Sequence, residues 1–475
     1  MQAKRIHNFL LLVGTNIITK GAWALCLIIM LRSLGAEEFG LLVTLWAIGT
    51  IAAVFSDLGV SQVLLRDGAR QKDRIKALAR TTLFVNSIIA ILLTCILAIL
   101  VWLFFEIPEI STVKKILIIF SGVSTPIIDR FQNIFTVFSQ LNERFNTYTK
   151  IRSLYFTILL LSFWVVSYIQ PSLTNFSITY FFITIIATIV MGTTIWDQLP
   201  VESDLISTDS FSTLIKYGFP FLWITALTFA YGRIEVVILS LHGETGVSGV
   251  YHIIYQIVLL VYSLSGMFFT VIYPRLYQHK KHPDLLNEDY KDTISWLTLL
   301  VAVTSPLIFL YANQILALLG GEELSNYICI IHELTLLILL LPASVALNFL
   351  LPMDMLKHRI ISDAIGIGIT IFGILILLES NNIEHIALAA VIGYLASVIT
   401  AMYSLNNKTR VTISTTFSEM LFISIRALIP FALIYFLSMP WWLGVPVYLL
   451  IFYFILMKTQ HHLTQKLSKI TYKLI

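Results

Sequence analysis

Eight ionisable side chains interrupt long apolar stretches of this sequence. They are Lys20, Asp57, Asp129, Arg130, Arg233, Glu235, Glu333 and Arg426. In hydrocarbon such a group costs about 2.5–3.5 kcal/mol on insertion scales, so each is expected to face a partner or a wet cavity. Basic groups at such depth can neutralise an anion, and carboxylates there can take up and release a proton or a cation. The pattern predicts a polar binding site inside a membrane.

Lys20 and Arg233 are the first candidates for binding an anionic substrate. With a helical rise of about 1.5 Å per residue, Lys20 lies ~16 Å beyond the start of its apolar run, near mid-membrane. Asn16, one turn before Lys20, adds a polar neighbour on the same side. Arg130 is a further candidate and points about 100° away from the adjacent Asp129. The alternative for each charge is structural, with a neighbouring side chain neutralising it.

Four carboxylates are candidate carriers of a coupling proton or cation, because burial disfavours the charged form of a carboxylate. They are Asp57, Asp129, Glu235 and Glu333. Two alternatives stay open. Lys20 on an adjacent helix could simply neutralise Asp57, and the side chain of Glu333, about two turns from the outer surface, could reach the interface. The sequence does not choose among the four.

Three tyrosines, Tyr251, Tyr255 and Tyr262, lie within about 40° of one another around one expected helix. Aromatic rings that carry hydroxyl groups suit the apolar and polar faces of sugars. Packing between helices or a place in the interfacial belt is the alternative, and it is favoured for Tyr251. Tyr255 and Tyr262 are therefore the candidate sugar contacts.

Two apolar stretches carry a polar face. A continuous helix over residues 217–241 would align Thr225, Thr228, Gly232 and Glu235, with Arg233 at the flank. Within residues 114–140, polar residues recur at steps of three and four: Thr125, Asp129, Gln132, Asn133, Thr136 and Gln140. Pro126 should kink that helix. Neither face is expected to contact lipid.

The elements that must position these residues are fourteen apolar stretches, most of which reach the roughly 20 residues of a membrane-crossing helix. They run over 9–31, 41–65, 81–105, 114–140, 151–169, 176–195, 217–241, 250–273, 294–319, 327–351, 361–378, 386–405, 420–437 and 444–457. Since 57% of the residues are hydrophobic and 12% charged, a soluble protein is excluded. The expected fold class is an all-α polytopic membrane protein with about 14 transmembrane helices.

The basic residues of the loops fall almost wholly on one side. With a cytoplasmic N-terminus, 24 of the 31 Lys and Arg residues lie inside, including Arg152 and Arg359, and 3 lie outside. This bias predicts both termini in the cytoplasm. It also explains the net charge of +4 without a nucleic-acid partner. Because Lys20 stands in the first stretch and no cleavage site follows, that stretch is expected to be a span rather than a signal peptide.

Enzyme chemistry is not expected. The sequence has no G-x-x-x-x-G-K-[ST] motif for nucleotide binding, and Leu336 stands where a zinc motif beginning at His332 and Glu333 needs its second histidine. The loops are too short to hold a catalytic domain. Cys26, Cys95 and Cys329 lie in apolar stretches, so neither a disulfide nor a metal site is expected. We predict no cofactor.

A Ser-, Thr- and Asp-rich segment divides the chain. It predicts an N-terminal lobe over residues 1–196, a cytoplasmic linker over 197–216, a C-terminal lobe over 217–405, and two additional helices with a basic tail over 406–475. Transporters are often built from such repeated halves.

Several motifs resemble those of bacterial polysaccharide and O-antigen flippases, in the superfamily of multidrug, oligosaccharidyl-lipid and polysaccharide exporters. They are Leu31-Arg-Ser-Leu-Gly-Ala-Glu-Glu-Phe-Gly40, Phe55-Ser-Asp-Leu-Gly-Val-Ser-Gln-Val-Leu-Leu-Arg66, Tyr217-Gly-Phe-Pro220, Gly246-Val-Ser-Gly-Val-Tyr251 and Tyr273-Pro-Arg275. The resemblance implies two six-helix lobes forming a V around a central cavity, with two C-terminal helices added. One departure is that Ile234 separates Arg233 from Glu235, whereas many relatives have an adjacent acidic and basic pair.

The resemblance also implies a function. An undecaprenyl-pyrophosphate-linked oligosaccharide would move to the outer leaflet of the bacterial inner membrane, for lipopolysaccharide or other surface polysaccharide. Alternating access and antiport with H+ or Na+ would drive it, and the implied partners are membrane lipids and a polymerase with its chain-length machinery. A multidrug exporter of the same fold is the alternative, and a membrane polymerase or glycosyltransferase is a further one.

Overall fold

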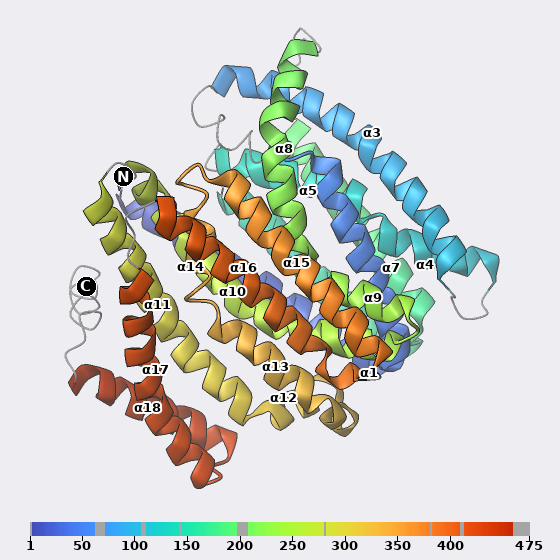
Figure 1. The fold of residues 1–475 in the computed structure, drawn as a ribbon. Helices are drawn as coiled ribbons and strands as arrows, with labels where there is room; N and C mark the ends of the chain where they lie inside the picture. Colours follow the sequence, from blue (N-terminus) through green and yellow to red (C-terminus); the bar gives the residue numbers. More distant parts are fainter. Residues whose placement is uncertain are drawn as a thin grey trace. The chain divides into compact units, whose positions relative to one another are not determined.

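The computed structural model describes residues 2–61, 72–105, 111–141, 145–196, 208–279, 282–380, 382–408 and 413–458. Within these ranges the chain is almost wholly helical and contains no strand. It forms two compact units, residues 1–256 and residues 257–475, and helix α10 (Thr245–His279) runs from the first unit into the second (Figure 1). The prediction of an all-α membrane fold is confirmed.

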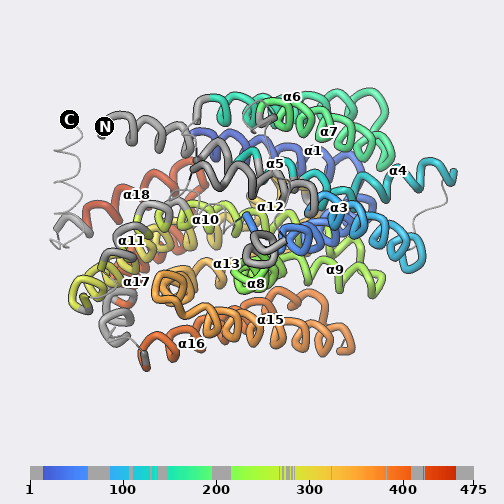
Figure 2. The backbone as a smooth tube through the Cα atoms, turned by 90° about the horizontal axis from the view of Figure 1, so that it is seen from above, coloured from blue at the N-terminus to red at the C-terminus, as the bar shows by residue number. Residues whose placement is uncertain are grey.

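The described part of the first unit begins with the long helix α1 and contains eight further helices or parts of helices. They are α1 (Gln2–Asp57), α3 (Lys72–Phe104), α4 (Thr112–Val123), α5 (Thr125–Leu141), α6 (Phe145–Ile169), α7 (Leu173–Trp196), α8 (Thr208–Ala230), α9 (Ile234–Leu241) and the start of α10. Helix α1 is the centre of the unit, because 78% of its apolar window is buried against 17% in α3. Helices α6 and α7 pack on each other and run side by side in Figure 2.

The second unit contains the rest of α10 and the helices that follow. They are α11 (Pro283–Leu310), α12 (Ala312–Gly320), η1 (Glu322–Tyr327), α13 (Ile328–Leu339), α14 (Val345–Phe349), α15 (Leu356–Glu379), η2 (Ile383–His385), α16 (Ile386–Lys408), α17 (Ile413–Phe436) and α18 (Trp441–Lys458). Helices α15 and α16 pack along each other, and Tyr290 and Phe349 lie in a core that joins α10, α11 and α14.

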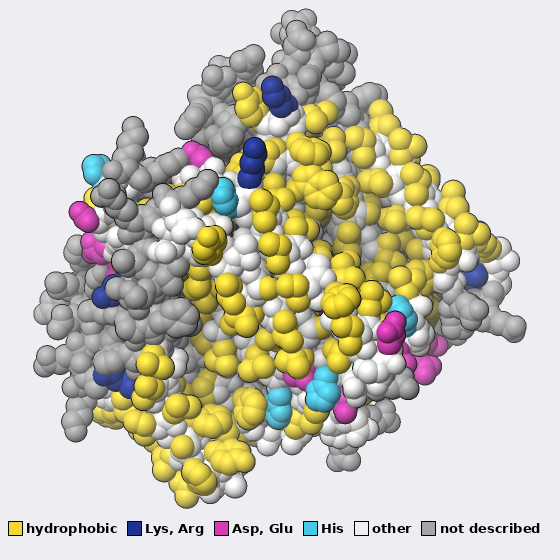
Figure 3. All heavy atoms as spheres, in the orientation of Figure 1, with side chains coloured by type: hydrophobic (Ala, Val, Ile, Leu, Met, Phe, Trp, Pro, Cys, Tyr) yellow, Lys and Arg dark blue, Asp and Glu magenta, His cyan; other side chains and the backbone are white. Residues whose placement is uncertain are grey.

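Eight helices among the described residues are long and apolar enough to cross a membrane, and a bent pair makes a ninth. Three shorter apolar helices accompany them. Within the described residues, each of the fourteen predicted stretches coincides with one helix, with two consecutive helices, or with one half of α1. Helix α1 holds two stretches because it bends at Gly35, whose φ is 77°. Apolar side chains cover most of the described surface in Figure 3, as contact with lipid requires.

Four predicted stretches are interrupted in the described residues, and two of these breaks lie in stretches with a predicted polar face. The expected kink at Pro126 is a break at Ser124, which leaves Pro126 in the first turn of α5, where its missing N–H is tolerated. The predicted continuous helix over 217–241 is wrong: α8 ends at Ala230 and α9 begins at Ile234, with a bend of 57°. The four residues expected on one face of that helix therefore do not share a face. Gly232 makes the turn with a φ of 73°, a conformation that only glycine adopts readily.

Candidate functional site

Helices α9 and α10 are held against the second half of α1 by small residues and hydroxyl groups. A Cβ atom on Gly40 would lie 1.8 Å from the Thr245 carbonyl oxygen, so only glycine allows this approach. Thr44, one turn after Gly40 on α1, adds a buried hydroxyl contact. Its Oγ1 lies 2.6 Å from Ser240 Oγ, and the hydroxyls of Ser240 and Ser248 are 3.0 Å apart. These contacts fix the segment that carries Arg233 and Glu235 relative to α1.

Lys20 lies where α1 packs on α6. The two helices are joined by a hydrogen bond from Thr15 to Thr149, 2.9 Å between their Oγ1 atoms. The guanidinium of Arg152 on α6 is close enough to act on Lys20 as a like charge, and it donates to Tyr148 Oη at 2.8 Å. No carboxylate in the described ranges pairs with Lys20. This arrangement of two cations, which we call the Lys20–Arg152 pair, calls for an anion.

Sequence reasoning missed Arg152. The predicted stretch 151–169 begins one residue before Arg152, so this residue was counted at the cytoplasmic edge of the membrane, whereas α6 begins at Phe145 and Arg152 stands in its second turn. Polar residues at the start of α6, such as Asn146 and Thr147, make its first residue difficult to predict from hydropathy. A basic residue within the first turns of an apolar helix was the available signal. Asn16, a predicted neighbour of Lys20, lies one turn before it on α1, and its carbonyl accepts from Thr19.

The break between α8 and α9 carries Arg233 and Glu235. Arg233 precedes α9, lies 5.0 Å from the centroid of the Phe229 ring, and donates from Nη1 to the Phe229 carbonyl at 3.2 Å. Glu235 stands in the first turn of α9 and is 0% exposed. The backbone N–H groups of Gly232 and Glu235 and the guanidinium of Arg233 lie within electrostatic range of its carboxylate, and no side chain in the described residues donates a hydrogen bond to it. This buried acid beside a backbone break suits a group that binds and releases a proton.

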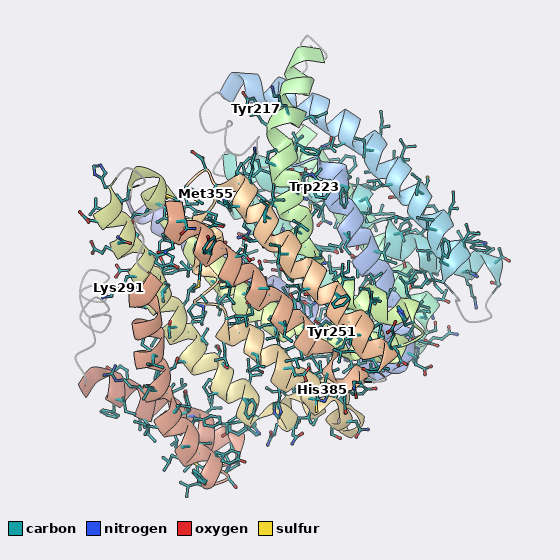
Figure 4. All side chains as sticks on the ribbon, viewed as in Figure 1. Tyr217, Trp223, Tyr251, Lys291, Met355 and His385 are labelled. Carbon is teal, nitrogen blue, oxygen red and sulfur yellow. The ribbon has the colours of Figure 1, made fainter. Side chains whose placement is uncertain are left out.

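Aromatic side chains of α10 pack against the break between α8 and α9. A Cβ atom on Gly232 would lie 1.9 Å from the Tyr255 ring, so this ring covers the glycine directly. Tyr251, labelled in Figure 4, is fully buried and stacks on Tyr255 with 6.0 Å between ring centroids. On the same helix, His252 is within electrostatic range of Arg233, and its Nε2 lies 3.0 Å from Gln256 Nε2. His252 is a second polar group at the break that the sequence analysis did not single out.

Other predicted site residues lie elsewhere. Asp57 at the end of α1 accepts from Ser61 at 2.6 Å, and no ion pair with Lys20 forms within the described parts of the chain. In the second unit, Glu333 Oε1 is 2.6 Å from His385 Nδ1, and Tyr262 donates to the Leu337 carbonyl. The side chains of Asp129 and Arg130 lie outside the described residues.

The second unit holds a buried ion pair that the sequence analysis did not predict. Arg359 Nε donates to Asp363 Oδ2 at 2.6 Å, one turn further along α15, and Ser397 on α16 donates to Asp363 Oδ1 at 3.2 Å. The count of basic residues had assigned Arg359 to a cytoplasmic loop. Because α15 begins at Leu356, Arg359 instead lies buried in its first turn, where it stabilises the packing of α15 on α16. No group of three or more potential metal-ligating side chains occurs in the described residues.

A family model described as polysaccharide biosynthesis protein matches residues 6–280. No functionally curated protein matches the sequence. Among solved structures, the lipid II flippase MurJ in an inward closed conformation is similar, with a TM-score of 0.69, 13% identity, and 94% of this chain and 97% of that chain covered. An inward-facing multidrug resistance MATE family transporter of the MOP superfamily has a TM-score of 0.62 and 16% identity, covering 82% and 94% of the two chains.

A MOP superfamily transporter from Pyrococcus furiosus has a TM-score of 0.53 and 13% identity, covering 86% of this chain and 99% of that chain. At these identities the three solved structures establish the fold alone. That fold is the one shared by flippases and exporters of the superfamily, and it makes the chain a multi-pass membrane protein.

Proposed function

This chain belongs to the polysaccharide biosynthesis protein family, and we propose that it is a flippase for a lipid-linked oligosaccharide. It moves an undecaprenyl-pyrophosphate-linked repeat unit from the cytoplasmic to the outer leaflet of the bacterial inner membrane, for surface polysaccharide such as O-antigen. Both termini are cytoplasmic, in keeping with the distribution of basic residues. The lipid tail stays in the bilayer while the polar head group passes through the protein. No covalent bond changes, so the protein acts as a transporter and not as an enzyme.

The Lys20–Arg152 pair is the observation that carries this proposal. Two positive charges within electrostatic range repel each other, and their desolvation within apolar helices costs further free energy. A diphosphate offsets both costs, since it offers several anionic oxygens and a guanidinium can bind two of them at once. A cationic drug would add to the repulsion, so this pair favours a flippase over a multidrug exporter of the same fold.

The break between α8 and α9 supplies a second cationic position. Half-helix N-termini in transporters direct partial positive charge toward anionic substrate groups. Arg233 stands at such a terminus and adds a full charge. Arg130, Tyr255 and Tyr262 stay candidate substrate contacts.

Movement is driven by an ion gradient or the membrane potential, because the sequence has no nucleotide-binding motif. Each charge moved through 100 mV supplies about 2.3 kcal/mol. Glu235 is the first candidate for the coupling acid, since it is fully buried and no described side chain donates a hydrogen bond to it. Asp57, Asp129 and Glu333 stay alternatives, and H+ or Na+ is the coupling ion.

A complementation experiment tests the function. Cells that lack this gene should accumulate lipid-linked repeat units on the cytoplasmic side and lose surface polysaccharide, and a plasmid copy should restore both. Sensitivity to cationic drugs should stay unchanged. Normal polysaccharide together with increased drug sensitivity would instead identify a multidrug exporter.

A further inference from the structure

Four aromatic rings from α1, α6 and α7 meet beside the Lys20–Arg152 pair. They are Trp23, Trp46, Phe156 and Tyr180, and we call them the aromatic cluster. Ring centroids are 5.4 Å apart for Trp23 and Trp46, and 4.7 Å apart for Trp46 and Tyr180. Phe156 closes the group at 6.4 Å from Trp23. All four belong to the first unit.

The aromatic cluster and the two cations lie on the same helix faces. Trp23 follows Lys20 by three residues on α1, and Phe156 follows Arg152 by four residues on α6. Residues at these spacings are neighbours on a helix surface, about one turn or 5 Å apart along the axis. That separation is of the order of the distance between a phosphate group and the sugar ring bonded to it. A diphosphate at the cations therefore brings its first sugar to the rings.

Three of the four rings are only partly buried. Trp23, Phe156 and Tyr180 keep part of their surface accessible, whereas Trp46 is 5% exposed. By contrast, Phe163 and Phe176 on the same helices are fully buried. The open surfaces leave room for the apolar C–H face of a sugar to stack.

Trp46 also presents an unused hydrogen-bond donor. Its indole Nε1–H is buried and has no acceptor among the residues described. An indole N–H can only donate, and leaving a buried donor unsatisfied costs about 1–3 kcal/mol. An acceptor oxygen brought by a ligand removes that cost.

We propose that the aromatic cluster binds the first sugar of the head group and that Trp46 Nε1–H donates to an acceptor oxygen of that sugar. The proposal rests on the proposed function, because the Lys20–Arg152 pair must hold the diphosphate. Trp23 or Tyr180 shifts to admit the sugar, since the Trp46 N–H is covered in this structure. The acceptor is an acetamido carbonyl or a sugar hydroxyl. Trp46 is thus a residue that determines specificity for the sugar.

Binding measurements on the purified full-length protein test the proposal with three probes. They are undecaprenyl diphosphate alone, the same lipid with one hexose, and the same lipid with one N-acetylhexosamine. The native protein should bind at least one sugar-bearing lipid about five- to tenfold more tightly than the bare diphosphate. Trp46→Phe keeps a ring but removes the donor, so it should lose most of this preference while binding the bare diphosphate as before. Preference for the acetamido sugar assigns the acceptor to its carbonyl; equal binding of both sugars assigns it to a hydroxyl.

Three further variants make the outcome unambiguous. Trp164→Phe, at an exposed tryptophan on α6, should change nothing. Tyr180→Leu should weaken only the sugar-bearing lipids, and it carries the test if Trp46→Phe does not fold. Lys20→Ala should weaken all three probes. This proposal alone is overturned if the folded Trp46→Phe variant keeps the native preference for the sugar-bearing lipids. If Trp46→Phe does not fold, an unchanged preference in Tyr180→Leu overturns it. Equal binding of all three probes by the native protein also overturns it. Failure of the native protein to bind any probe overturns the proposed function as well.

Discussion

Lys20 and Arg152 bring two positive charges together from α1 and α6, and no described carboxylate pairs with Lys20. The depth of Lys20 could be predicted, because counting residues along an apolar stretch measures distance into the membrane. Arg152 could not be placed in the same way. Polar residues open α6, so hydropathy set the start of the helix at residue 151 instead of Phe145 and left Arg152 at its edge. The position of a charged residue in the membrane could be predicted where the helix boundary was clear. Where the boundary was unclear, the prediction was wrong.

Removing the charge of Lys20 should abolish surface polysaccharide. Lys20→Ala removes one of two groups that would neutralise the diphosphate, and Lys20→Arg should do less harm because it keeps the charge. Polysaccharide output is measured in cells that lack the native gene, with membrane insertion checked by immunoblot. Lys115→Ala, which alters a cation beside Trp102 4.6 Å from the ring, is the matched control. Native output from Lys20→Ala would show that this charge is structural.

Glu235→Gln should uncouple transport from the gradient. Glutamine keeps the shape of the buried side chain but cannot release a proton, so only slow downhill movement should remain. The rate of movement with and without an imposed proton or sodium gradient is the measurement. Glu244→Gln, in the loop before α10, should keep the native response. A gradient response in Glu235→Gln equal to the native one would assign coupling to another acid.

At the scale of helices, the break between α8 and α9 shows what periodicity cannot reveal. The apolar pattern of residues 217–241 continues through Gly232, so the sequence predicted one helix. The turn depends on a positive φ at Gly232 and on the Tyr255 ring above it, which comes from a different helix. A tertiary contact of this kind leaves no signal in the local sequence. The bend in α1 at Gly35 was predicted as the boundary between two stretches, because polar residues surround it.

Gly232→Ala should destabilise the protein. A side chain at this φ costs about 1–2 kcal/mol, and its Cβ would overlap the Tyr255 ring. The thermal unfolding midpoint in detergent should fall by several degrees. Gly192→Ala is the control, since a Cβ there meets nothing within 4 Å. Equal midpoints for both variants would mean that the break tolerates a side chain.

At the scale of the whole molecule, fourteen predicted stretches correspond to helices throughout the described chain. This success has a simple cause, because helix length and hydropathy are set by the thickness of the bilayer. Domain organisation is less accessible. The predicted linker at 197–216 and the lobes on either side of it stay predictions, whereas the compact units divide at residue 256, within α10. Because α8 and α9 pack on α1, they belong to the first unit. Hydropathy alone does not predict which helices pack together.

Reporter fusions should confirm the sidedness of the chain. The excess of basic residues predicts an outside signal for fusions after Gly243 and Gly321, and an inside signal after Ser203. Paired alkaline phosphatase and fluorescent protein fusions measure both sides. An inside signal at Gly243 and at Gly321 would reverse the predicted orientation.

A flipping assay shows directly whether this protein moves a lipid-linked diphosphate sugar across a bilayer. Proteoliposomes containing an undecaprenyl-diphosphate oligosaccharide are prepared with native protein, with the Lys20→Ala variant, or without protein. We expect the native protein to expose the sugar rapidly to an external lectin, and faster with an ion gradient, whereas Lys20→Ala should expose it near the protein-free rate. Exposure at the protein-free rate for the native protein, with and without a gradient, would contradict the proposed function.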